Sequence, residues 1–84
     1  MQNKRITIVE DDEITALNLK LSLKKQGYDV ISVYDNAATA KNKMNTDNPD
    51  IVIIDISLQE SNDGIELAKH IRKKHNIPFI FLTS

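Results

Sequence analysis

Acidic side chains stand at the ends of two apolar runs in this sequence. Glu10 and Asp11 directly follow the run at residues 6–9, and Asp55 directly follows the run at residues 51–54. A charge beside such an apolar run costs several kcal/mol unless a cation or a metal ion accompanies it. If the two runs are neighbouring strands, the three carboxylates meet and repel one another until a divalent cation neutralises them. Oxygen ligands with retained waters suit Mg²⁺, so the sequence predicts a magnesium site.

The same site would support phosphoryl transfer. Mg²⁺ can bridge carboxylate and phosphate oxygens and offset the charge that develops during transfer. Asp55 is then a candidate nucleophile that would form an aspartyl phosphate. The simpler alternatives are that residues 10–13 only place negative charge at a helix N-terminus, and that Asp55 is an ordinary strand-end residue. Because both features occur at strand ends, together with the Thr83 hydroxyl after a further strand, the sequence favours the chemical site.

Four short apolar runs and three longer amphipathic stretches alternate along the chain. The runs are β-branched or aromatic, which suits strands buried on both faces, and they lie at residues 6–9, 30–33, 51–54 and 79–82. Apolar residues recur at helical spacing between the runs, as at Ile14, Leu17 and Leu21. The pattern therefore predicts four strands and three helices.

The residues between these segments fit that reading. Asp12 and Asn36 are predicted to cap the first and second helices, and Gly27 is predicted to end the first. Each connection between strands is long enough to hold a helix, so the strands are expected to be parallel. Right-handed connections then place helices on both faces of the sheet. The predicted fold is an α/β doubly wound sheet.

The composition excludes several classes of protein. Eighty-four residues support one domain, and without cysteine there is no disulfide framework and no thiolate zinc site. A formal net charge of −1 gives no basic excess for binding nucleic acid. No apolar run approaches the ~20 residues that span a bilayer, and the first residues do not form a signal segment. We therefore expect a cytoplasmic protein with no direct nucleic-acid or membrane contact.

Four ordered motifs together resemble the receiver domain of two-component response regulators. They are IVEDD at residues 8–12, DIVIIDI at residues 50–56, DGIEL at residues 63–67 and IPFIFLT at residues 77–83. The resemblance covers the whole chain and implies a flavodoxin-like parallel sheet with strand order 2-1-3-4, built here as (βα)3β. The family has a further helix, strand and helix that this sequence lacks. We therefore expect residues 1–84 to form a receiver domain that is incomplete at its C-terminus.

The resemblance also implies a role for each candidate site residue. Asp55 matches the phosphorylated aspartate, and Asp11 matches a direct Mg²⁺ ligand. Glu10 matches the acid that acts mainly through water. The backbone carbonyl of Ser57 would complete the metal shell. Thr83 matches the hydroxyl that moves toward the phosphoryl group on activation.

The sequence departs from the family pattern in two places. Gln59 stands where the family often has proline, so the dynamics of this loop do not transfer. The absent C-terminal elements would carry the lysine that pairs with the phosphoryl group and the aromatic switch residue. Their absence leaves residues 79–82 as an apolar edge strand, which could pair with a second copy of the chain.

The expected function is that of a signalling switch and not of an enzyme. A sensor histidine kinase or a phosphotransfer protein would phosphorylate Asp55 and so switch an output. One alternative is a Mg²⁺-dependent phosphohydrolase, although Ser57 occupies the place where such enzymes usually carry a second acid. The other is a degenerate receiver that acts only as a binding module. The basic stretch with His70 and His75 is expected to be a solvated helix face.

Overall fold

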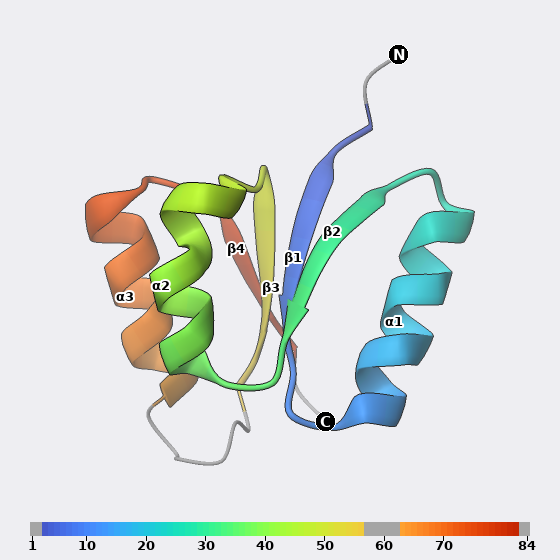
Figure 1. Cartoon of the computed structure of the whole chain (residues 1–84), viewed down its shortest axis with the longest axis horizontal. Coiled ribbons are helices and arrows are strands. Elements are labelled where there is room, and N and C mark those ends of the chain that lie inside the picture. Colours follow the sequence, from blue (N-terminus) through green and yellow to red (C-terminus); the bar gives the residue numbers. More distant parts are fainter. Residues whose placement is uncertain (1–2, 57–62, 83–84) are drawn as a thin grey trace.

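A computed structural model describes residues 3–56 and 63–82, in which strands and helices alternate as predicted (Figure 1). The strands are β1 (Arg5–Val9), β2 (Asp29–Tyr34), β3 (Ile51–Asp55) and β4 (Phe79–Leu82). The helices are α1 (Glu13–Lys25), α2 (Ala37–Asp47) and α3 (Asp63–Lys74). In the described ranges, no helix combines the length and the apolar character that crossing a membrane requires.

The strands form one parallel sheet with the order β2-β1-β3-β4. Helix α1 covers one face of the sheet, and α2 and α3 cover the other (Figure 1). This confirms the doubly wound α/β class and the predicted strand order. Because β1 lies between β2 and β3, the carboxyl ends of β1 and β3 are neighbours, as the candidate site requires.

The predicted caps of the first two helices are confirmed. The Asp12 carboxylate accepts a hydrogen bond from the Thr15 amide at 3.0 Å, and the Asn36 side chain accepts one from the Thr39 amide at 2.7 Å. Gly27 follows the end of α1 with a φ of 95°, a left-handed conformation that glycine adopts without strain. Local sequence signals thus set the ends of these helices.

The larger part of the core lies between the sheet and the helices α2 and α3. Met44, Leu67 and Ile71 project from the two helices onto Val52 and Ile54 of β3. Each of these side chains is at most 2% exposed. Burying a side chain of this size contributes about 1.5–3 kcal/mol, so this face supplies most of the hydrophobic stabilisation.

The core on the other face is thinner. It consists of Ile6, Ile8 and Ile53, with Leu19, Leu23, Val30, Ile51 and Leu82 partly buried around them. Within α1, only Ala16 is fully buried. Burying a side chain as small as alanine removes little apolar area from water.

An apolar stripe on α1 faces away from this core. Ile14 is 70% exposed, Leu17 is 54% exposed and Leu21 is 52% exposed. The spacing of these residues predicted the helix, and the helix is confirmed, but they are not the residues that it buries. We refer to Ile14, Leu17 and Leu21 as the α1 stripe.

Arg5 ties the amino end of β1 to the turn between α2 and β3. Its guanidinium donates to the carbonyl oxygens of Asn48 and Asp47 at 2.9 and 2.8 Å, and its backbone amide donates to the Asp50 carboxylate at 2.8 Å. The guanidinium thereby satisfies carbonyls that the end of α2 leaves without partners inside the helix.

Candidate functional site

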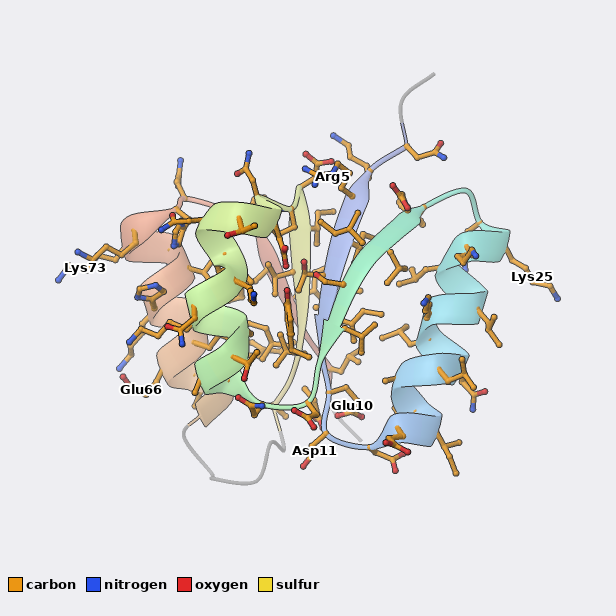
Figure 2. All side chains as sticks on the ribbon, viewed as in Figure 1. Arg5, Glu10, Asp11, Lys25, Glu66 and Lys73 are labelled. Atoms are coloured by element: carbon orange, nitrogen blue, oxygen red, sulfur yellow. The ribbon has the colours of Figure 1, made fainter. Side chains whose placement is uncertain are left out.

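The carboxyl ends of β1 and β3 bring three acidic residues together. Val9 of β1 is in register with Ile54 of β3, so the next residues, Glu10 and Asp55, lie beside each other. Carboxylate oxygens of Glu10, Asp11 and Asp55 all lie within 4.8 Å of one another. Figure 2 shows Glu10 and Asp11 at the end of the sheet opposite Arg5. We refer to the three residues as the acidic triad.

Two members of the acidic triad are buried. Glu10 and Asp55 are each 6% exposed, whereas Asp11 is partly exposed. The Glu10 backbone amide donates to the Tyr34 carbonyl at 2.9 Å, which holds this residue against the end of β2. Beyond Asp55, the Ile56 amide donates to the Leu82 carbonyl at 3.1 Å. Backbone pairing with both neighbouring strands therefore fixes the positions from which the triad projects.

The electrostatics of Glu10 show strain within the acidic triad. Burial of the side chain, a side-chain hydrogen bond with Asp55 and repulsion by Asp55 and Asp11 raise the pKa of Glu10 to about 7. The Oε2 atom of Glu10 is buried and makes no hydrogen bond among the described residues. A buried oxygen without a partner and three convergent carboxylates are the features that a divalent cation would neutralise and satisfy. The triad therefore fits a metal ion with oxygen ligands, such as Mg²⁺.

Asp12, which follows Asp11 in the sequence, does not belong to the acidic triad and instead caps a helix. The Asp12 carboxylate caps α1 by accepting from the backbone amide and the hydroxyl of Thr15. These two hydrogen bonds lower the pKa of Asp12, because they stabilise its charged form. The run of acids at residues 10–13 is thus divided between the acidic triad and the start of the helix, so both interpretations of this run hold for different residues.

Gly64 lies directly against the phosphoacceptor candidate. A Cβ atom at this position would approach the backbone carbonyl oxygen of Asp55 to 3.1 Å and a methyl carbon of Ile54 to 3.2 Å. A glycine at this position allows the close approach of α3 to the end of β3, which a side chain would obstruct.

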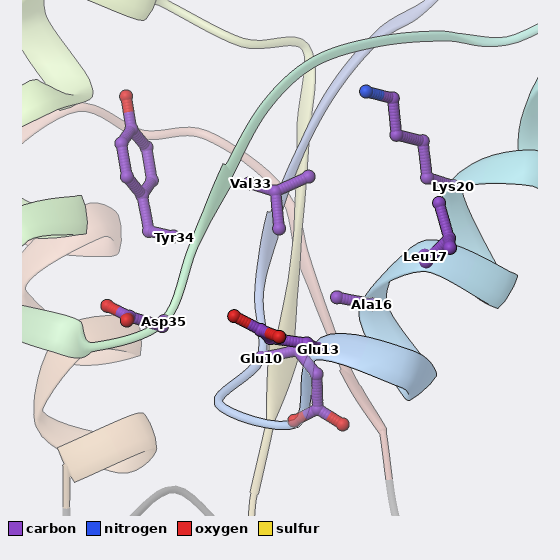
Figure 3. Close-up of a pocket in the computed structure, with 8 residues that line it drawn as sticks. All are labelled: Glu10, Glu13, Ala16, Leu17, Lys20, Val33, Tyr34 and Asp35. Atoms are coloured by element: carbon purple, nitrogen blue, oxygen red, sulfur yellow. The ribbon is translucent and has the colours of Figure 1, made fainter.

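A pocket of about 440 Å³ opens beside the acidic triad, between α1 and β2 (Figure 3). It is lined by Glu10, Glu13, Ala16, Leu17, Lys20, Val33, Tyr34 and Asp35. The sequence carried no signal for this pocket, because its lining comes from two elements whose spacing is set only by packing. The pocket extends from Leu17, the middle residue of the α1 stripe, to the buried Glu10.

Three residues discussed from the sequence lie outside the described parts of the structure. They are Ser57 and Gln59 after β3, and Thr83 after β4. The backbone carbonyl role of Ser57 and the hydroxyl role of Thr83 remain predictions. The described residues bring together Glu10, Asp11 and Asp55 as the sequence predicted.

The fold and this acidic site define a class of protein: a doubly wound parallel α/β domain with carboxylates at the ends of its first and third strands. The chain belongs to the response regulator receiver domain family, whose profile matches residues 6–84. Receiver domains are generally signalling modules without enzymatic activity of their own, and they generally partner histidine kinases.

Solved structures of receiver domains superpose closely on this chain. The signal receiver domain of a modulated diguanylate cyclase from Desulfovibrio desulfuricans G20 is 38% identical with a TM-score of 0.90, over 96% of this chain and 65% of that one. The N-terminal domain of a response regulator/sensory box/GGDEF protein from Carboxydothermus hydrogenoformans is 34% identical with a TM-score of 0.86, over 95% of this chain and 64% of that one. The present chain thus spans less than two thirds of either relative.

Proposed function

We propose that this chain is the phosphoacceptor module of a two-component phosphorelay, with Asp55 as the residue that accepts the phosphoryl group. An Asp55 carboxylate oxygen would attack the phosphorus of a phosphohistidine on a sensor kinase or a phosphotransfer protein. The new O–P bond forms as the N–P bond breaks, and the electron pair of that bond returns to the imidazole nitrogen. The observation that carries this proposal is the convergence of three carboxylates within 4.8 Å at the ends of β1 and β3.

A divalent cation is the cofactor that this donor set suits. Asp11 and Asp55 would hold Mg²⁺ directly, Glu10 would act mainly through water, and the backbone carbonyl of Ser57 would complete the shell. Bound Mg²⁺ would offset the negative charge that the phosphoryl group brings to three carboxylates.

Glu10 would contribute a carboxyl group to this site that gains and loses its proton near neutral pH. With a pKa of about 7, its carboxyl group is largely protonated in mildly acidic solution and can donate its hydrogen bond to Asp55. That arrangement keeps the negative charge on the nucleophile instead of on its neighbour. A cation that displaces this proton binds more tightly as the pH rises, because the ligand must be ionised.

The α1 stripe offers a contact surface for the phosphodonor protein. Helix α1 begins at Glu13, two residues after Asp11 of the acidic triad, so a partner that packs on the start of the helix would lie near Asp55. Ile14, Leu17 and Leu21 are more than half exposed, and large exposed apolar side chains that align on one helix mark interaction sites. The pocket beside Leu17 could receive one side chain of that partner.

The test is phosphorylation of the full chain by acetyl phosphate with Mg²⁺, followed by intact-mass measurement. The wild-type chain should gain one phosphate-sized, alkali-labile adduct, and Asp55→Asn should gain none. Asp29→Asn is the matched control, because Asp29 is an exposed aspartate at the opposite end of the sheet. It should be modified like the wild type.

Other outcomes would replace the proposal. An adduct that persists in Asp55→Asn would show that another residue accepts the phosphoryl group. Sustained turnover of a small phosphate ester would indicate a phosphohydrolase. Absence both of the adduct and of Mg²⁺-dependent NMR shifts at residues 10–12 and 55–56 would indicate a degenerate receiver that only binds partners.

A further inference from the structure

A groove runs between α2 and α3, which lie side by side on the same face of the sheet (Figure 1). It consists of two pockets of about 550 and 350 Å³ that share Lys41 and His70. The larger one is also lined by Ala37, Ala38, Glu66, Leu67, Lys69 and Lys73, and the smaller one by Asn42, Asn45, Lys74 and His75. We refer to it as the α2–α3 groove.

The charge of this groove is opposite to that of the chain as a whole. Four lysines line it, Lys41, Lys69, Lys73 and Lys74, whereas the chain has a net charge of −1. Among the described residues that line it, the one carboxylate is Glu66, whose Oε1 atom lies 3.7 Å from the ammonium nitrogen of Lys69. The smaller pocket is lined only by side chains that carry hydrogen-bond donors. The described lining of this groove thus carries a local excess of positive charge.

The pKa of His70 is sensitive to the positive charges that line the groove. It is partly buried between the helices, with its ring centroid 5.4 Å from that of His75 in an edge-to-face arrangement. Burial, followed by the charges of Lys41, His75 and Lys74, lowers the pKa of His70. Protonation of His70 is therefore disfavoured until an anion enters the groove. Both the geometry of the groove and the positive charges around His70 favour an anionic ligand.

We propose that the α2–α3 groove binds an acidic polypeptide segment of a partner protein. The two pockets follow each other along the helices, so a segment with several carboxylates can meet Lys41, Lys73 and Lys74 in turn. Asn42 and Asn45 add amide groups that can pair with the peptide backbone. The inference concerns a surface other than the acidic triad and does not rest on phosphorylation of Asp55.

Two features distinguish this ligand from other anions. The part of the groove lining that the structure describes holds no arginine and no phenylalanine, tyrosine or tryptophan. Arginine binds phosphates bidentately, and aromatic side chains stack on bases. Its larger pocket also has an apolar part, formed by Ala37, Ala38 and Leu67, that suits the aliphatic side chains of a peptide. A peptide in which carboxylates alternate with small apolar residues would match both the lysines and the apolar part of this lining.

The test is titration of the full chain with a synthetic peptide of alternating glutamate and alanine, followed by NMR. Backbone shifts should centre on residues 37–45 and 66–75. The double variant Lys41→Gln with Lys74→Gln should weaken binding about five- to tenfold, since two charge contacts are lost. Lys24→Gln with Lys25→Gln, two exposed lysines at the end of α1, should weaken it less than twofold.

Several results would overturn the inference. Equal weakening by both double variants would show diffuse attraction without a site, and absence of binding at low salt would show that the groove takes no acidic segment. Displacement of the peptide by millimolar inorganic phosphate, or tighter binding of a single-stranded oligonucleotide at the same residues, would reassign the ligand. The variant Lys41→Arg with Lys74→Arg should bind like the wild type, and loss of binding there would contradict a charge-based site.

Discussion

The two faces of the sheet differ in how well their helices cover them. On the face of α2 and α3, the side chains of Met44, Leu67 and Ile71 are almost completely buried. On the face of α1, the helix fully buries only Ala16 and leaves Leu17 and Leu21 more than half exposed. The first face is a packed core, whereas the second combines a thin core with apolar surface that remains available for contact.

This difference separates the packed face that stabilises the fold from the exposed face that we propose for partner docking. Apolar side chains between α2, α3 and the sheet hold the fold and need no partner. Apolar side chains of similar type on α1 contribute little to folding, because water still reaches them. The acidic triad lies at the carboxyl ends of β1 and β3, the two central strands of the sheet. A protein that docked on α1, as we propose, would lie next to this site.

The strongest test of this contrast is a pair of leucine truncations. Leu67→Ala should lower the free energy of unfolding by ~2–5 kcal/mol, since Leu67 is 2% exposed and its removal leaves a cavity. Leu21→Ala, on a helix of similar length, should change it by about 0.5 kcal/mol or less. Urea denaturation of both variants would measure this. Similar losses for the two variants would show that α1 packs as tightly as α3.

The pH dependence of stability tests the site where the two faces meet. Folding raises the pKa of Glu10 from 4.5 to about 7, so the folded state binds this proton more tightly than the unfolded state. The stabilisation that comes from protonated Glu10 is therefore fully present below pH 4.5 and is lost as the pH rises to about 7. This loss lowers the free energy of unfolding by up to about 3 kcal/mol.

The measurement is denaturant unfolding from pH 4.5 to pH 8 with a chelator present. Glu10→Gln should flatten the profile, because glutamine keeps a donor for Asp55 without the charge. Glu13→Gln, an exposed neighbour in the same acidic run, should keep the wild-type profile. Added Mg²⁺ should restore stability at pH 8 in the wild type. An unchanged slope in Glu10→Gln would assign the pH dependence to another group.

The smallest expected effect concerns β4, which lies at one edge of the described sheet. Ile80 in this strand is 53% exposed, and an apolar edge strand favours pairing with a second copy. Ile80→Lys should weaken self-association in sedimentation experiments about tenfold, equivalent to about 1.4 kcal/mol. Val33→Lys on the opposite edge strand should leave it unchanged. A wild-type chain that stays monomeric, with a melting temperature independent of concentration, would refute pairing through β4.

Much of the fold follows from local sequence signals. β-branched runs give the strands, Asp12 and Asn36 cap two helices, and each connection is long enough for the crossover that parallel strands need. The convergence of Glu10 and Asp55 could also be predicted, because both follow strands and parallel strands end at the same edge of a sheet.

The tertiary structure decided what local patterns leave open. Helix α1 has apolar residues on two sides, and only packing against the sheet selected Ala16, Leu19 and Leu23 over the α1 stripe. The raised pKa of Glu10 depends on burial and on a neighbour that is 45 residues away in the chain. The local excess of positive charge in the α2–α3 groove likewise requires two helices to meet. Sequence determines what is local, because backbone preferences and hydrophobic periodicity act over a few residues, whereas burial and electrostatic fields arise only when distant segments are brought into contact.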